Sequence, residues 1–144
     1  MHFNELVKKA PLRTARADFR DLFGLEIIVT PNNEIAAAIS NATKSALNTT
    51  TGQYESEIDQ DKLRAYLVTR VAGFHGLTLR KAMTLCGRAL PDDMADKDKD
   101  QLPCEPETVA TLLQLVVGLQ IWLFGQLRTL GAEAARREAA ALGN

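Results

Sequence analysis

The sequence TVATLLQLVVGLQIWLFGQL, residues 108–127, has no charged side chain over twenty positions and decides how the chain folds. A segment of this kind must bury most of its surface in a core, in a partner protein or in a lipid bilayer. The amides of Gln114, Gln120 and Gln126 cannot be satisfied in lipid, and the preceding residues CEPE are acidic rather than basic. We therefore expect a helix buried in protein, with no membrane span.

Small side chains recur every seven residues along this helix, at Thr111, Gly118, Gly125 and Ala132. Glycine in a helix interior costs about 1 kcal/mol relative to alanine, so two of them indicate a packing reason. A stripe of small side chains lets a second helix approach closely, while flanking apolar residues supply contact area. The expected interface consists of Thr111, Leu115, Gly118, Trp122, Gly125 and Ala132. The alternative is that the glycines only mark local backbone packing.

The pattern of apolar and polar segments predicts a mainly α fold, an all-α domain except for one short N-terminal β-strand, ending in a long apolar helix. At 144 residues we expect a single domain, residues 1–144. Its parts are an N-terminal arm, strand and helix (1–50), a helical hairpin (54–90), an acidic loop (91–105) and the long C-terminal helix (106–142).

Within these parts, the strand is expected at Leu25–Thr30, which is rich in β-branched residues and bounded by Gly24 and Pro31. The stretch before it, residues 12–23, is compatible with a short amphipathic helix or an extended arm. Apolar residues at helical spacing predict helices over residues 34–47, 57–72 and 78–90, with a loop at residues 48–53.

Residue chemistry gives little support to catalysis. The sequence shows no phosphate-binding glycine loop, no zinc-protease motif and no nucleophile motif. Cys86 and Cys104 lack the paired spacing of a metal site, His75 is expected in a turn between helices, and the acidic loop lacks the calcium-loop pattern. No secretory leader opens the sequence. We therefore expect a cytoplasmic, non-enzymatic protein with free thiols and without metal or cofactor.

A DNA-binding alternative comes from residues 62–90, which hold six basic residues and no acidic one. Two helices joined at Gly76 would resemble a helix-turn-helix unit, in which Arg80, Lys81, Thr84 and Arg88 face the DNA. The net charge of −1 argues against nucleic acid or an anionic membrane as a bulk electrostatic partner. Nucleic-acid binding therefore remains the second hypothesis.

Two motifs carry a resemblance to a known group of proteins. They are VAGFHGL at residues 71–77 and LPCEPETVA at residues 102–110, followed by QIWL at residues 120–123. With them, residues 24–130 resemble the small tail assembly chaperones and minor tail proteins of long-tailed bacteriophages. Those proteins usually carry tryptophan where this chain has Phe74, and an Asp-Gly pair where it has Asp98-Lys99-Asp100.

The resemblance implies a non-enzymatic role in the cytoplasm of an infected cell. The protein would bind and solubilise a long helical partner, the tape measure protein, during tail assembly. An apolar helix surface that pairs with another helix suits such a role. We also expect the chain to form a homo-oligomer.

Overall fold

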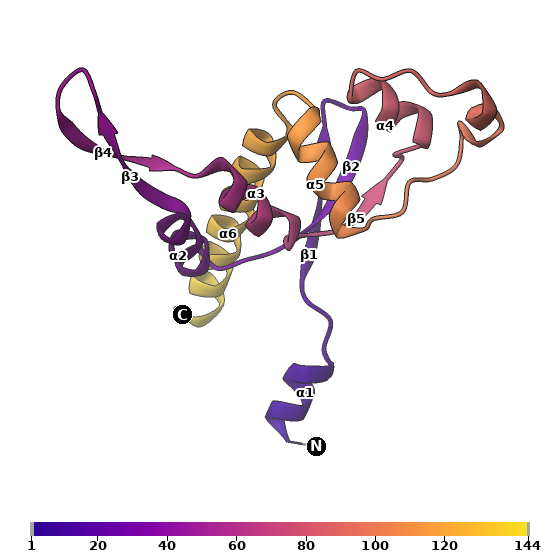
Figure 1. The fold of residues 1–144 in the computed structure, drawn as a ribbon. Helices are drawn as coiled ribbons and strands as arrows, with labels where there is room; N and C mark the ends of the chain where they lie inside the picture. Colours follow the sequence, from indigo (N-terminus) through magenta and orange to yellow (C-terminus); the bar gives the residue numbers. More distant parts are fainter. Residues whose placement is uncertain (1, 144) are drawn as a thin grey trace.

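The structure, a computed structural model, describes residues 2–143 (Figure 1). Its elements in chain order are α1 (Phe3–Lys9), β1 (Thr14–Phe19), β2 (Phe23–Ile28), α2 (Asn32–Ala42), β3 (Thr43–Asn48), β4 (Gln53–Ile58), α3 (Gln60–Val68), β5 (Val71–His75), α4 (Leu79–Leu85), the 3₁₀ helix η1 (Asp92–Lys97), α5 (Pro106–Leu115) and α6 (Leu119–Leu142).

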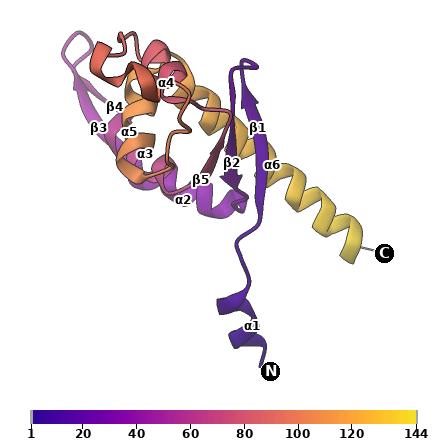
Figure 2. The ribbon, with the colours of Figure 1, turned by 90° about the vertical axis from the view of Figure 1, so that its right-hand side faces the viewer.

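The fold combines helices with two antiparallel sheets, so the expectation of a mainly α domain with one strand is wrong. The described residues form a three-stranded sheet in the order β1-β2-β5 and a separate β3-β4 hairpin. Helix accounts for 52% of the described residues and strand for 22%, which makes this an α/β structure. Figure 2 shows α6 crossing one face of the three-stranded sheet and continuing beyond it.

The β1-β2 hairpin is formed largely by residues 12–23, for which the sequence is compatible with a short amphipathic helix or an extended arm. In β1, Ala15, Ala17 and Phe19 are less exposed than the residues between them, the period-2 pattern of a half-buried strand. The hairpin turns at Arg20 and Asp21, which both have positive φ. Asp tolerates this conformation better than most residues.

The expected strand Leu25–Thr30 corresponds to β2, which starts and ends two residues earlier. It is the central strand, with β1 on one side and β5 on the other. Its side chains Phe23, Leu25 and Ile27 are buried together with Phe19. This apolar face of the sheet packs into one core with buried leucines and valines of α3, α5 and α6.

Two expected helices are shorter than predicted because strands occupy their ends. Helix α2 ends at Ala42, and the chain continues directly as strand β3. In place of the expected helix 57–72, only α3 is helical, and it lies between the strands β4 and β5. The loop at residues 48–53 is the turn of the β3-β4 hairpin, in which the Asn48 side chain accepts hydrogen bonds from the amides of Thr50 and Thr51. The expected helical hairpin 54–90 is therefore two short helices separated by a strand.

The prediction of one long C-terminal helix over residues 106–142 is also wrong. The apolar stretch contains two helices, α5 and α6, at 113° to each other. Val116 is extended and Gly118 is left-handed with φ of 82°, so helical hydrogen bonding stops between them. The side chain of Gln120 bonds to Gln60 and Arg64 on α3, which satisfies one of the three amides. No single helix within residues 2–143 is long and apolar enough to cross a membrane. Helices α5 and α6 taken together have the length and composition of a membrane span, but they are bent against each other.

Helix α6 is held against the start of α2 at Gly131, a residue outside the expected stripe. A Cβ at this position would lie 2.6 Å from the carbonyl oxygen of Thr30 and 2.7 Å from Oδ1 of Asn32. The backbone of the β2-α2 connection therefore requires glycine in α6 at this point.

We expect Gly131→Ala to destabilise the protein by about 1–3 kcal/mol, because a backbone carbonyl is in the way of the new methyl group. Gly125→Ala is the matched control, because no atom lies within 4 Å of its Cβ position. The control should gain up to about 1 kcal/mol through better helix propensity. Chemical denaturation measures both; equal stability of the two variants would contradict the close approach at Gly131.

Candidate helix-binding groove

The main candidate site is an open groove between α2 and α6, which lie side by side (Figure 1). The cavity has a volume of about 670 Å³. Its lining consists of Asn32, Ile35, Ala36 and Ile39 from α2 and Gly125, Arg128, Thr129 and Ala132 from α6. We refer to it as the α2-α6 groove.

The groove exists because the two helices touch at one point and separate from there. Contact is closest where Gly131 meets Thr30 and Asn32 at the start of α2. Less than two turns earlier on α6, Gly125 faces open space. The groove therefore runs from this close contact to an open position on α6 that has no side chain.

Small and apolar side chains dominate the floor, and polar groups lie among them. Ile35 is buried at the base of the groove, Ile39 is half-buried, and Ala36 and Ala132 add little volume. The guanidinium of Arg128 stacks over the ring of Phe124 at 5.7 Å from its centroid. Such a surface favours the apolar face of an amphipathic helix and offers a cation to its polar side.

The structure brings two of the six expected interface residues, Gly125 and Ala132, to this groove. The other four residues lie outside the lining of the groove. Thr111 lies on α5 beside a smaller cavity of about 330 Å³, and Leu115 is at the end of that helix. The ring of Trp122 packs on Phe19 of the sheet, 5.2 Å between centroids.

Gly118 has a different role from the one expected, since it forms the break between α5 and α6. Beside it, Nη2 of Arg20 donates a hydrogen bond of 3.0 Å to the carbonyl oxygen of Val117. The same guanidinium lies over the ring of Phe19. Arg20 thus ties the β1-β2 turn to the break, a long-range contact that no local sequence pattern indicates.

The helix-turn-helix arrangement is not present, because residues 71–75 form the strand β5 between α3 and α4. Two of its proposed DNA contacts are occupied within the chain. Arg80 pairs with Asp98 at 3.2 Å, and Nζ of Lys81 donates to the carbonyl oxygens of Leu22 and Gly76. Of the remaining two residues, Thr84 lies on α4, and Nη1 of Arg88, just after that helix, donates to the carbonyl oxygen of Cys86 at 3.3 Å. The DNA-binding alternative loses the geometry on which it was based.

Titratable groups within residues 2–143 form no cluster of three or more potential metal ligands. His75 lies in β5 rather than in a turn between helices, and its Nε2 is 2.6 Å from Oε1 of Glu26 on β2. Cys86 and Cys104 are free thiols, and burial raises the pKa of both.

Comparison with known proteins found no family model, no curated protein and no solved structure that matches this chain.

We expect Gly118→Ala to lower the stability by about 1–3 kcal/mol, because alanine is strained at positive φ. Gly118→Asn should lower the stability less than Gly118→Ala does, since asparagine tolerates the left-handed conformation. The guanidinium of Arg20 lies 2.8 Å from the Cβ position but is flexible and can move. Thermal melts compare the variants; an alanine variant as stable as wild type would show that the break does not depend on the left-handed residue.

A second prediction concerns Cys86 and Cys104, whose raised pKa values lower the fraction of reactive thiolate at a given pH. At pH 8 the native thiols should react with iodoacetamide at least about tenfold more slowly than in 6 M guanidinium, because both ionisation and access are reduced. Mass spectrometry of the two cysteine peptides follows the reaction. Equal rates in both conditions would contradict the burial of the thiols.

Proposed function

We propose that this protein is a non-enzymatic, tail assembly chaperone-like protein that binds a helical structural partner in the α2-α6 groove and associates with itself. The observation that carries the proposal is the groove itself, in which the Cβ position of Gly125 faces open space. The partner's chemical class is an amphipathic helix, as in a tape measure protein. In this proposal the protein acts in the cytoplasm.

The spacing of the lining residues along α2 and α6 supports a helical occupant. Packed helices keep their axes about 8–10 Å apart, and they approach most closely where side chains are small. Gly125 and Ala132 lie seven residues apart on α6, about two helical turns, and Ile35 and Ile39 lie one turn apart on α2. A third helix lying along this seam would contact apolar side chains from both helices.

The resemblance at residues 71–77 and 102–110 supports the same role independently of the groove. In the structure these motifs are β5 with the turn after it, and the entry into α5. They connect where Leu102 donates its amide hydrogen to the carbonyl oxygen of Leu77 at 2.9 Å, beside the bridge between Thr78 and Gln101. The two motifs are therefore in contact in the fold.

The proposal predicts that the reading frame immediately downstream of this chain encodes a long, helix-rich protein, and it is tested by co-expressing the product of that frame with the chain. We expect the tagged chain to keep that protein soluble and to co-purify with it. Gly125→Leu should reduce the co-purified partner at least tenfold, since the leucine side chain fills the groove. Its own melting temperature should not fall, because the space at Gly125 is open in the free protein.

Ala139→Leu is the control, since Ala139 is exposed on the same helix outside the groove. This variant should bind like wild type. The proposal is wrong if Gly125→Leu retains the wild-type amount of partner, or if wild type recovers no soluble partner.

A further inference from the structure

The N-terminal helix α1 makes no packing contact that buries any of its residues. Its apolar side chains Phe3, Leu6 and Val7 lie on one face and are 76%, 51% and 56% exposed. Isolated helices shorter than about 12–15 residues are marginal in water, and α1 has seven. A helix this short with an uncovered apolar face needs another surface to stabilise it.

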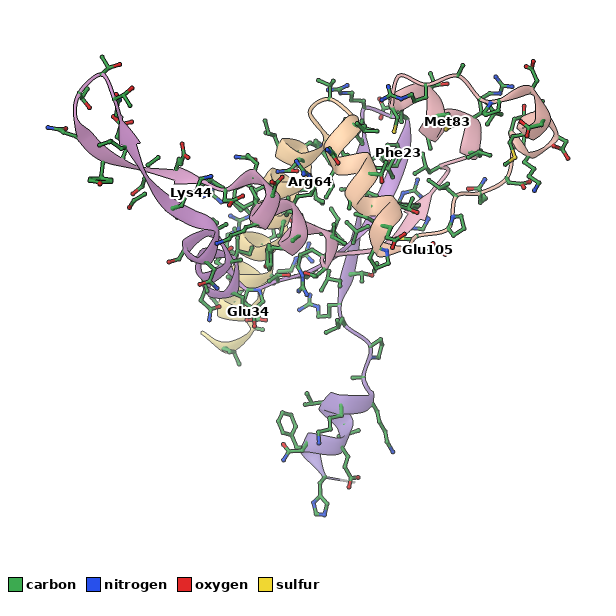
Figure 3. The ribbon with its side chains drawn as sticks, in the orientation of Figure 1. Phe23, Glu34, Lys44, Arg64, Met83 and Glu105 are labelled. Atoms are coloured by element: carbon green, nitrogen blue, oxygen red, sulfur yellow. The ribbon has the colours of Figure 1, made fainter. Side chains whose placement is uncertain are left out.

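The β3-β4 hairpin is a second element without a covering layer. Figure 3 shows Lys44 at its base and side chains projecting on both sides of the ribbon. A two-stranded hairpin by itself is marginally stable at best. The hairpin therefore also lacks the packing that would hold it.

The two faces of this hairpin differ in chemistry. Directly opposed residues share a face, and one face pairs Leu47 with Tyr54, which are 53% and 76% exposed. The opposite face is polar: Lys44 pairs with Glu57 at 3.6 Å, and Nδ2 of Asn48 donates to Glu55 at 2.9 Å. Only the Leu47-Tyr54 face can accept an apolar helix.

Charge favours contact between the two elements. Residues 2–13 contain three basic side chains and one acidic, a net charge of +2. Residues 43–59 contain one basic side chain and three acidic, a net charge of −2. Glu55 and Glu57 lie on the face opposite Leu47 and Tyr54, so this attraction acts through the net charge of the hairpin rather than through direct ion pairs, and salt screens it over about 8 Å.

Within one chain the two elements project in different directions, α1 below the sheet and the hairpin away to one side, in both views (Figures 1 and 2). The tether between α1 and β1 is residues 10–13, which reach at most about 14 Å when fully extended. The arm is thus positioned to meet a neighbouring molecule rather than its own hairpin.

We propose that α1 of one copy docks on the Leu47-Tyr54 face of the β3-β4 hairpin of a second copy. The apolar side chains of the arm cover the apolar face of the ribbon, and the opposite net charges of the two segments attract one another. This interface rests on the self-association in the proposed function and is separate from the α2-α6 groove.

The test measures the mass of the chain alone by light scattering over a range of concentrations. Wild type should associate, and Leu6→Asp and Tyr54→Asp should each weaken the apparent association constant at least tenfold. Both side chains are exposed in the single chain, so the fold should survive, as circular dichroism can verify. Asn4→Asp and Gln53→Asp are the controls: they add the same charge to the polar side of the arm and to the opposite hairpin face, and should change the constant less than threefold.

A cross-linking experiment identifies the contact. Leu6→Cys and Tyr54→Cys are made in separate chains carrying different tags, mixed and oxidised. The yield of disulfide between the two differently tagged chains should be at least tenfold higher than in a control mixture of Leu6→Cys with Gln53→Cys. A wild-type chain that stays monomeric, association insensitive to Leu6→Asp or Tyr54→Asp, or equal cross-linking of the two mixtures would each overturn the proposal.

Because this test uses no partner protein, its outcome is distinguishable from that of the groove. Gly125→Leu should leave the mass of the chain unchanged while it abolishes partner binding. If Gly125→Leu alone dissociates the wild-type oligomer, the copies meet at the groove and the arm-hairpin contact is wrong.

Discussion

The structure depends on the sharp bend between α5 and α6. Without it, the uncharged run of residues 108–127 would form one rod with apolar side chains on several faces. With it, Val109 and Leu112 on α5 and Leu123 and Leu127 on α6 reach one core from two directions. The hydrogen bond from Arg20 to the carbonyl oxygen of Val117 joins this bend to the β1-β2 turn. The sheet, the bend and the direction of α6 are thus fixed together, and the direction of α6 in turn opens the groove beside α2.

The apolar run, the central strand β2 and the proline-led start of α5 could all be predicted, because each leaves a local signal of composition or spacing. The bend could not, since a glycine in an apolar run predicts close packing and left-handed backbone equally well. Gly118, Gly125 and Gly131 show the difficulty: one forms the break, one faces open space and one touches backbone, and only their surroundings distinguish them. The β3-β4 hairpin could not be predicted, because its strands carry mostly polar residues. Nearly all of these residues are exposed, so the sequence lacks the alternation of apolar and polar residues that identifies a half-buried strand.

The candidate site was predicted in part, for a reason that the fold explains. A seven-residue spacing identifies one face only along a continuous helix, and α6 preserves it between Gly125 and Ala132. The side of the groove formed by α2 had no signal, because Ile35 and Ile39 look like ordinary core residues of an amphipathic helix. The chain thus offers two separate apolar surfaces, the groove for a helix and the arm with the hairpin for another copy. Separate surfaces allow assembly and partner binding to be gained or lost independently.

The contact between Arg20 and Val117 also bears on how the chain folds. The two residues are 97 positions apart, so the contact between the β1-β2 turn and the bend cannot form until most of the chain has been synthesised. Pairings of such long sequence separation slow folding, because the loop must close before the contacts can form. Until α5 and α6 have been synthesised, the apolar face of the sheet lacks the cover that these helices supply and is prone to aggregation.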